Sequence, residues 1–211
     1  MVQMPDPIAA VRRLFPPEPG EIHRYAGDLV VPEESGDTLW VDVPYGEGEG
    51  QVIEEPVASR FPVVVTLTPS EQGLPASAAT VLFRDLPERF HPGGASAGLL
   101  PGIGMMYLTW GDPSEQAAEP MLLTALPELR RRGASREDNL GWYRPQFEEL
   151  IARTPVVDDE PAYREGWFEH VTDPATGANA IGFLTGERSA GSVRFTDDEG
   201  RILAAGVVLD G

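Results

Sequence analysis

The chain has 211 residues, with 34 acidic and 16 basic side chains giving a formal net charge of −18, and it contains no cysteine. A hydrophobic content of 41% is typical of globular proteins and excludes the disordered and disulfide-stapled classes. The missing cysteine also excludes thiolate metal sites and cysteine nucleophiles.

The charge balance narrows the range of partners. A strongly acidic surface repels phosphate backbones, and no basic stripe offsets it, so nucleic acid is not expected as a ligand. The basic residues are all arginine, which fits a GC-rich genome or, as an alternative, adaptation to high salt. No apolar run is long enough to span a membrane, and the first ten residues lack the apolar core of a signal peptide. We therefore expect a cytoplasmic protein.

The N-terminal half favours strands. A proline-rich arm over residues 1–27 contains a short helix at 8–15, and a single α+β domain is expected over 28–211. Alternating or β-branched apolar residues predict further strands. These strands cover residues 29–31, 38–43, 61–68, 78–84 and 104–110. The economical arrangement of 61–68 and 78–84 is a hairpin.

The periodicity then changes to that of helices. Ser114 is a good N-cap for a helical segment that ends in Arg130–Arg132, and this segment forms either two short helices or one helix kinked at Pro120. A further helix is expected over 135–153. Residues 163–170 fit either a short helix or a strand. Strands return at 178–184, 192–195 and 201–209, where Gly206 interrupts the alternation and suggests a bulge. The predicted fold class is α+β, mainly antiparallel sheet with two to three central helices, about 114–153, inserted between N-terminal and C-terminal strands.

One segment matches a catalytic motif. Gly94-Ala95-Ser96-Ala97-Gly98 fits G-x-S-x-G, followed by Asp158 or Asp159 and then His170 in the chain order of α/β-hydrolases. That motif requires a strand before the serine and a helix after it, whereas proline and glycine surround Ser96. A flexible loop is the better interpretation, and we predict no catalytic residues.

Metal sites are not expected either. His23, His91 and His170 are far apart and lack the spacing of metal ligands. The acidic segment 197–200 lacks the D-x-D-x-D-G pattern of a calcium loop and is typical of a turn between strands. We predict no metal and no cofactor.

Two candidate sites remain. The first is a binding face of aromatic residues with an acidic rim, suited to a cationic protein. It comprises Trp142, Tyr143, Trp167, Glu148, Glu149, Asp158 and Asp159. The alternative is a ligand site assembled at the sheet ends. It comprises Trp110, Asp112, His170 and Asn179.

The C-terminal region resembles an uncharacterised bacterial family known only as a domain of unknown function. The similarity rests on Asn179-Ala180-Ile181-Gly182-Phe183 with Thr185-Gly186, the turn around Asp197, and upstream Arg60-Phe61-Pro62-Val63. The chain departs from that family after Gly186, where Glu187–Gly191 replaces a Gly-Asp-Gly type turn. The resemblance implies a related fold and no particular activity.

These observations favour a non-enzymatic cytoplasmic protein that binds a basic protein partner, as immunity or antidote proteins do. The alternatives are a small-molecule enzyme or ligand-binding protein, and an acidic protein adapted to salt. The oligomeric state is left open.

Overall fold

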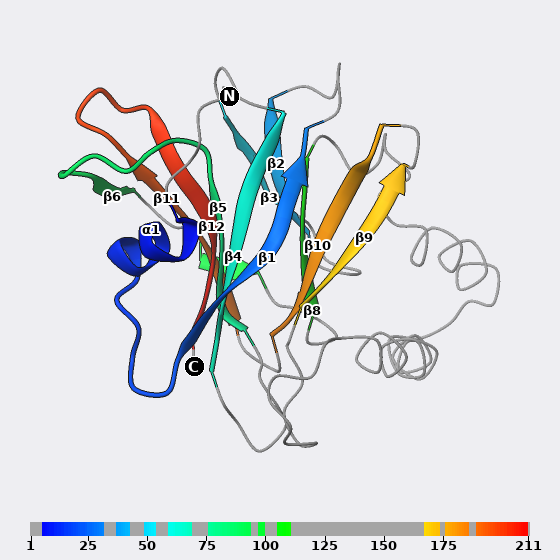
Figure 1. Cartoon of the computed structure of the whole chain (residues 1–211), viewed down its shortest axis with the longest axis horizontal. Helices are drawn as coiled ribbons and strands as arrows, with labels where there is room; N and C mark the ends of the chain where they lie inside the picture. Colours follow the sequence, from blue (N-terminus) through cyan, green and yellow to red (C-terminus); the bar gives the residue numbers. More distant parts are fainter. Residues whose placement is uncertain are drawn as a thin grey trace.

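The strands form two antiparallel sheets that face each other (Figure 1). The computed structural model describes residues 6–31, 37–42, 49–53, 59–68, 76–93, 97–99, 105–110, 167–173, 176–185 and 189–210. In this part of the chain, no helix is long and apolar enough to cross a membrane.

Within the described ranges, the first sheet has seven strands. Its order is β1 (Ile22–Val30), β4 (Arg60–Leu67), β5 (Ala76–Leu82), β12 (Ile202–Asp210), β11 (Ser189–Thr196) and β6 (His91–Gly93), and β7 (Ala97–Leu99) also pairs with β11. The predicted hairpin is confirmed, because β4 and β5 pair from Val63 opposite Val81 to Leu67 opposite Ala76.

The second sheet has five strands in the part of the chain that the structure describes. Its order is β3 (Glu49–Val52), β2 (Thr38–Asp42), β8 (Met105–Trp110), β10 (Ala178–Leu184) and β9 (Trp167–Asp173). The main core lies between the two sheets, where apolar side chains from alternate positions of both meet. Phe61, Phe83 and Trp110 form an aromatic cluster within it, with ring centroids 5.0 to 6.1 Å apart.

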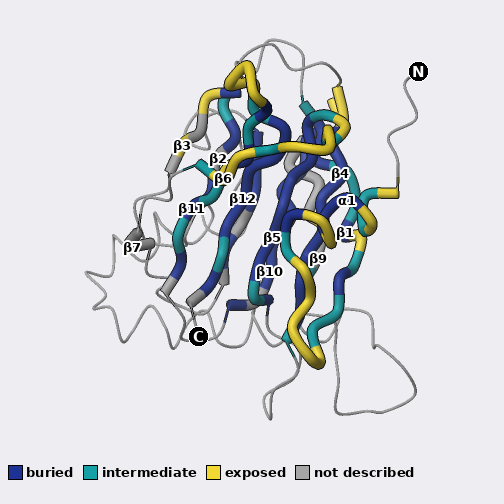
Figure 2. The backbone as a smooth tube through the Cα atoms, turned by 90° about the vertical axis from the view of Figure 1, so that its left-hand side faces the viewer, coloured by how far each residue is buried: buried dark blue, intermediate teal, exposed yellow. Residues whose placement is uncertain are grey.

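A short helix covers the outer face of the first sheet. This helix, α1 (Pro7–Leu14), begins where the Asp6 carboxylate accepts a hydrogen bond from the Ile8 N–H at 3.0 Å, and proline at its first position is compatible with a helix start. Its buried residues pack against a second, smaller core on that face. These contacts join Ala10, Val11 and Leu14 to Val64, Leu82, Phe195 and Ala204. Strand β4 is thus buried on both faces, which explains its unbroken apolar run (Figure 2).

The predicted α+β class is wrong for the described residues, which form mainly antiparallel sheet with one short helix. The inner face of the first sheet is covered by the second sheet, so central helices are not what buries it. The predicted helical segment 114–153 lies outside the described residues. Segment 167–170, which the pattern left open between helix and strand, begins β9 because it pairs with β10. The expected boundary at residues 27 and 28 falls inside β1.

Gly206 does not mark a bulge. It pairs in continuous register with Val193 on one side and Thr80 on the other, and the irregularity of β12 lies between its pairings with Phe195 and Thr196. A Cβ atom at Gly206 would lie 1.9 Å from the carbonyl oxygen of Ala79. The glycine is therefore required by the close approach of β5.

Candidate functional site

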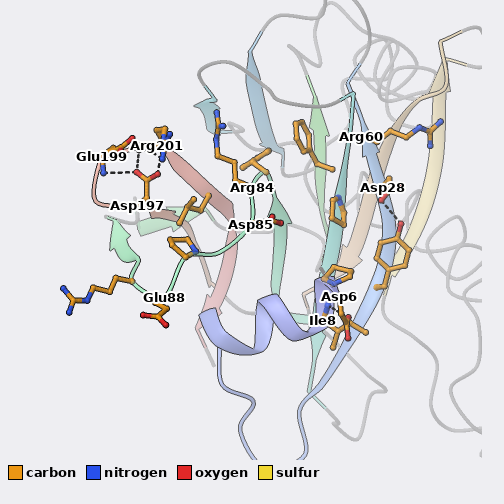
Figure 3. Close-up of a pocket in the computed structure, with 18 of the residues that line it drawn as sticks. Asp6, Ile8, Asp28, Arg60, Arg84, Asp85, Glu88, Asp197, Glu199 and Arg201 are labelled. Atoms are coloured by element: carbon orange, nitrogen blue, oxygen red, sulfur yellow. Dashed lines mark hydrogen bonds and ion pairs between the residues drawn. The ribbon is translucent and has the colours of Figure 1, made fainter. Parts of the chain in front are cut away.

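A large groove lies on the outer face of the first sheet (Figure 3). Its volume is about 1530 Å³. The N-terminus of α1 forms one wall, and the segment 83–89 and the turn 197–201 form the others. Between these walls lie the start of β4, the end of β5 and the start of β12, where Phe61, Pro62 and Leu203 belong to the lining although they are buried. Segments distant in sequence thus meet in one depression.

The lining of the groove is rich in carboxylates. Among the described residues, seven acidic residues and four arginines line it. The acids are Asp6, Asp28, Asp85, Glu88, Asp197, Asp198 and Glu199; the arginines are Arg60, Arg84, Arg89 and Arg201. The local charge therefore has the same sign as that of the whole chain.

The turn between β11 and β12 is fixed by its own acidic side chain. Asp197 Oδ1 accepts hydrogen bonds from the N–H groups of Glu199 and Arg201, and Oδ2 accepts from Arg201 Nε at 2.7 Å. Burial raises the pKa of Asp197, but the hydrogen bonds from Arg201 and from the turn backbone outweigh it, so the pKa lies below its usual value. Asp197 is therefore a charge at neutral pH and not a proton donor.

Residues 83–89, which follow β5, form a platform that hydrogen bonds with β12 and α1 hold in place. The N–H groups of Phe83 and Arg84 both donate to the carbonyl of Leu203, at 2.9 and 3.2 Å. From α1, the Arg13 guanidinium donates to the carbonyl of Leu86 at 2.9 Å and also to that of Pro87. Two carboxylates project from this platform.

Those carboxylates are Asp85 and Glu88. Both are exposed, and neither makes a hydrogen bond or an ion pair within the described part of the chain. They are consequently available to a ligand in a way that the carboxylate of Asp197 is not.

Tyr25 and Asp28 form the corner of the groove beside β1. The Tyr25 hydroxyl donates to Asp28 Oδ1 at 2.6 Å, while the tyrosine is 46% exposed. Burial of the hydroxyl, the hydrogen bond to Asp28 and the negative charges of Asp28 and Glu169 raise the pKa of Tyr25 to about 12, against a smaller opposing effect of Arg60. The phenol stays neutral and offers a ring face next to carboxylates, an arrangement that attracts cations.

Most of the predicted aromatic and acidic binding face falls outside the described residues. This holds for Trp142, Tyr143, Glu148, Glu149, Asp158 and Asp159. Trp167 is the first residue of β9, where it is half-buried and packs against the core between the sheets. The face as a whole stays a prediction.

The alternative ligand site is partly assembled by the second sheet. Strands β8, β10 and β9 bring the backbones of Trp110, Asn179 and His170 to the same end of that sheet, and Asp112 lies outside the described residues. Trp110 is only 1% exposed and belongs to the aromatic core. The side-chain amide of Asn179 already makes hydrogen bonds with Asp28, Val30 and Glu169.

Two strands of the first sheet flank Ser96, and His91 begins one of them. Residues 94–96 lie outside the described part, but β6 and β7 on either side are both strands paired with β11, so no helix follows the serine motif there. His91 Nε2 lies 2.7 Å from Asp198 Oδ1 at the exposed turn. Within the described ranges, no three potential metal ligands cluster.

Comparison of the chain with protein-family models, with curated proteins and with solved structures finds no significant match.

Sequence reasoning missed the groove. Its charged residues come from five separate segments, and no local motif links Asp6, Tyr25, Asp85 and Arg201. The one available signal was the excess of acid over base in the whole composition.

Proposed function

We propose that this protein acts by binding, and that the groove on the first sheet holds a cationic, extended segment of a partner protein. The single observation that carries the proposal is the groove itself, which in the described residues is lined by seven carboxylates, four arginines and several exposed or half-buried apolar groups. We place this binding in the cytoplasm, because a chain without cysteine is unaffected by the reducing conditions there.

The size of the groove supports an extended ligand. Pockets for small molecules usually measure about 300–1,000 Å³, and this one is larger, at about 1530 Å³. It also runs along the sheet surface between α1 and the turn 197–201 (Figure 3). A peptide segment fits such a shape better than a compact metabolite does.

The distribution of charge supports a cationic ligand. Arg201 is already paired with Asp197 and Glu199, so it does not offset the remaining acids of the groove. Asp85 and Glu88 are exposed and available, and Tyr25 adds an aromatic ring face beside Asp28. Arginine or lysine side chains of a partner would meet carboxylates at both ends of the groove.

Apolar groups in the lining of the groove add a second source of binding energy. Charges at an exposed site steer a ligand and select its sign, but each pair contributes only about 0.2–1 kcal/mol. Apolar side chains of the segment would bury surface against Ile8, Pro87 and the ring of Tyr25, which are exposed or half-buried. The preferred segment therefore combines basic and aliphatic residues, as an exposed strand or loop of a basic protein does.

The test is a titration with defined peptides. A fluorescein-labelled peptide of alternating arginine and leucine is added to the full chain, and binding is followed by fluorescence anisotropy. Binding is expected to weaken as salt rises from about 50 to about 500 mM, because screening shortens the range of the attraction. A peptide of equal length in which glutamate replaces arginine should not bind.

Variants locate the binding. The double change Asp85→Asn with Glu88→Gln should weaken binding by about three- to thirtyfold. The matched control is Glu18→Gln with Asp37→Asn, which removes two exposed carboxylates outside the groove and should change binding less than about twofold. Equal losses in both double variants would reject the groove as the site, and equal binding of the two peptides would reject the cationic preference.

A further inference from the structure

His23 on β1 is a buried titratable group on the α1 side of the first sheet. It is 4% exposed, and its Nδ1 lies 2.9 Å from the Thr66 hydroxyl on β4. Its Nε2 is buried and meets no hydrogen-bond partner among the described residues. A neutral ring is tolerable in this position, but a protonated ring would carry two N–H donors and a charge into it.

The charged surroundings of His23 come from the elements packed around it. Helix α1 contributes Arg12, which disfavours a second positive charge, and the residue before β1 contributes Glu21. The Glu21 carboxylate is held by the Ser77 hydroxyl at 2.7 Å, the Thr68 hydroxyl at 3.3 Å and the Glu18 N–H at 2.9 Å. It attracts the histidine without forming an ion pair with it.

Burial first, and then the Arg12 guanidinium, lower the pKa of His23 below its usual 6.5. Glu21 and the Phe15 carbonyl act in the opposite direction, but no acceptor in the described part of the chain meets Nε2 with hydrogen-bond geometry. When α1 leaves the sheet, the ring gains water and loses Arg12, so the open state binds a proton more readily. Docking of α1 is therefore unaffected above the usual pKa and weakens as the pH falls below it.

We propose that His23 is a pH-sensitive latch, and that protonation of its ring releases α1 from the outer face of the first sheet. Release would uncover apolar residues that α1 now buries, including Val64 and Leu82. It would also remove one wall of the groove, which residues 6–8 form. The effect on binding rests on the proposed function, whereas the latch itself rests only on the contacts of α1.

Hydrogen exchange of the α1 amides, measured on the full chain without peptide and corrected for intrinsic rates, tests the latch. Between about pH 7.5 and about pH 5.5, opening of residues 7–14 should increase up to about tenfold, while the amides of β5 stay protected. The variant His23→Gln should remove this pH dependence. His91→Gln, which alters an exposed histidine, should leave it intact.

A second variant covers the case in which His23→Gln does not fold. Arg12 is exposed, so Arg12→Gln should fold normally, and it should reduce the pH dependence by making the docked ring easier to protonate. Unchanged protection of α1 across this pH range in the wild type would overturn the latch. So would an unaltered pH dependence in either of these two variants. Since no peptide is present, failure here leaves the groove proposal standing, and failure of the peptide titration leaves the latch standing.

Discussion

The side chain of Asn179 on β10 binds the backbone of Val30 on β1, across the two sheets. Its Oδ1 accepts a hydrogen bond from the Val30 N–H at 2.8 Å, and its Nδ2 donates to the Asp28 carbonyl at 2.8 Å. These two backbone groups flank Leu29, and a parallel strand would bond the same pair. One amide thus takes the place of a neighbouring strand at the edge of the first sheet, where unpaired backbone groups invite aggregation.

Removal of this amide should destabilise the junction of the sheets. Asn179 is 3% exposed and also donates to Glu169 Oε1 at 2.6 Å. Asn179→Ala leaves the Val30 N–H and the Asp28 carbonyl without partners, and we expect a loss of about 2–4 kcal/mol in the free energy of unfolding. Urea denaturation measures it.

The aspartate variant refines this prediction. Asn179→Asp keeps the acceptor for Val30 but turns a carboxylate toward the Asp28 carbonyl and Glu169, so at neutral pH it should be at least as destabilising as alanine. If the free energy of unfolding of the alanine variant lies within about 0.5 kcal/mol of the wild-type value, the hydrogen bonds of Asn179 contribute little to stability.

Gly206 should not tolerate a side chain. Its Cβ would collide with the backbone of Ala79 and Thr80, which cannot move without disturbing the β5–β12 ladder. Gly206→Ala is expected to cost at least about 2 kcal/mol in thermal or urea unfolding. Gly177 is a contrasting control, because a Cβ there meets no atom within 4 Å and only its positive φ is strained. A Gly206→Ala variant as stable as wild type would refute the close packing of these strands.

Asp197 should contribute stability at neutral pH that acid removes. Its folded pKa lies below the usual 3.8, so the contribution is present above that value and is lost as the pH falls through the folded pKa. Asp197→Asn, which loses the charged contact with Arg201, should unfold at a lower temperature than wild type at pH 7. The difference between the two melting temperatures should shrink in strong acid; a constant difference at all pH values would argue against an ionised Asp197 as the cause.

The Tyr25 hydroxyl should lose its proton at a higher pH than an ordinary tyrosine does. Its pKa of about 12 exceeds the usual 10.0, so the stabilisation it gives is present below pH 10 and is lost as the pH rises through the folded value. The difference in phenolate absorbance between wild type and Tyr25→Phe isolates this group among the five tyrosines. Asp28→Asn should shift the titration toward 10 by weakening the hydrogen bond that holds the phenol neutral. A titration near 10 in the wild type would contradict the geometry of this corner.

The parts of the fold that the sequence predicts are those encoded by local patterns. The apolar run in β4 and the Asp6-Pro7 start of α1 identify their elements directly, since burial on two faces and an N-cap each leave a local signature. The first half of β1 is largely polar because it lies at a sheet edge, where Arg24 and Tyr25 are partly exposed, and its register is interrupted between Tyr25 and Gly27. This part of the strand therefore shows no alternation of apolar and polar residues.

The partner of a sheet face leaves no local signature. Helical periodicity over 114–153 predicts central helices between the strands, whereas in the described residues the opposing sheet buries the inner face of the first sheet. The position of Asn179 was predicted at a sheet end, but its bonds to Asp28 and Val30 depend on strands about 150 residues apart in the chain. The groove depends on the same kind of long-range assembly.

The most direct test of the binding groove is a hydrogen-exchange footprint of the arginine–leucine peptide on the full chain. We expect slower exchange on peptide addition in segments 83–89 and 197–201 and at the start of α1, and none of this slowing with the glutamate–leucine peptide. Protection confined to residues 142–167 would instead assign binding to the aromatic and acidic face predicted from sequence, and would contradict the groove as the binding site.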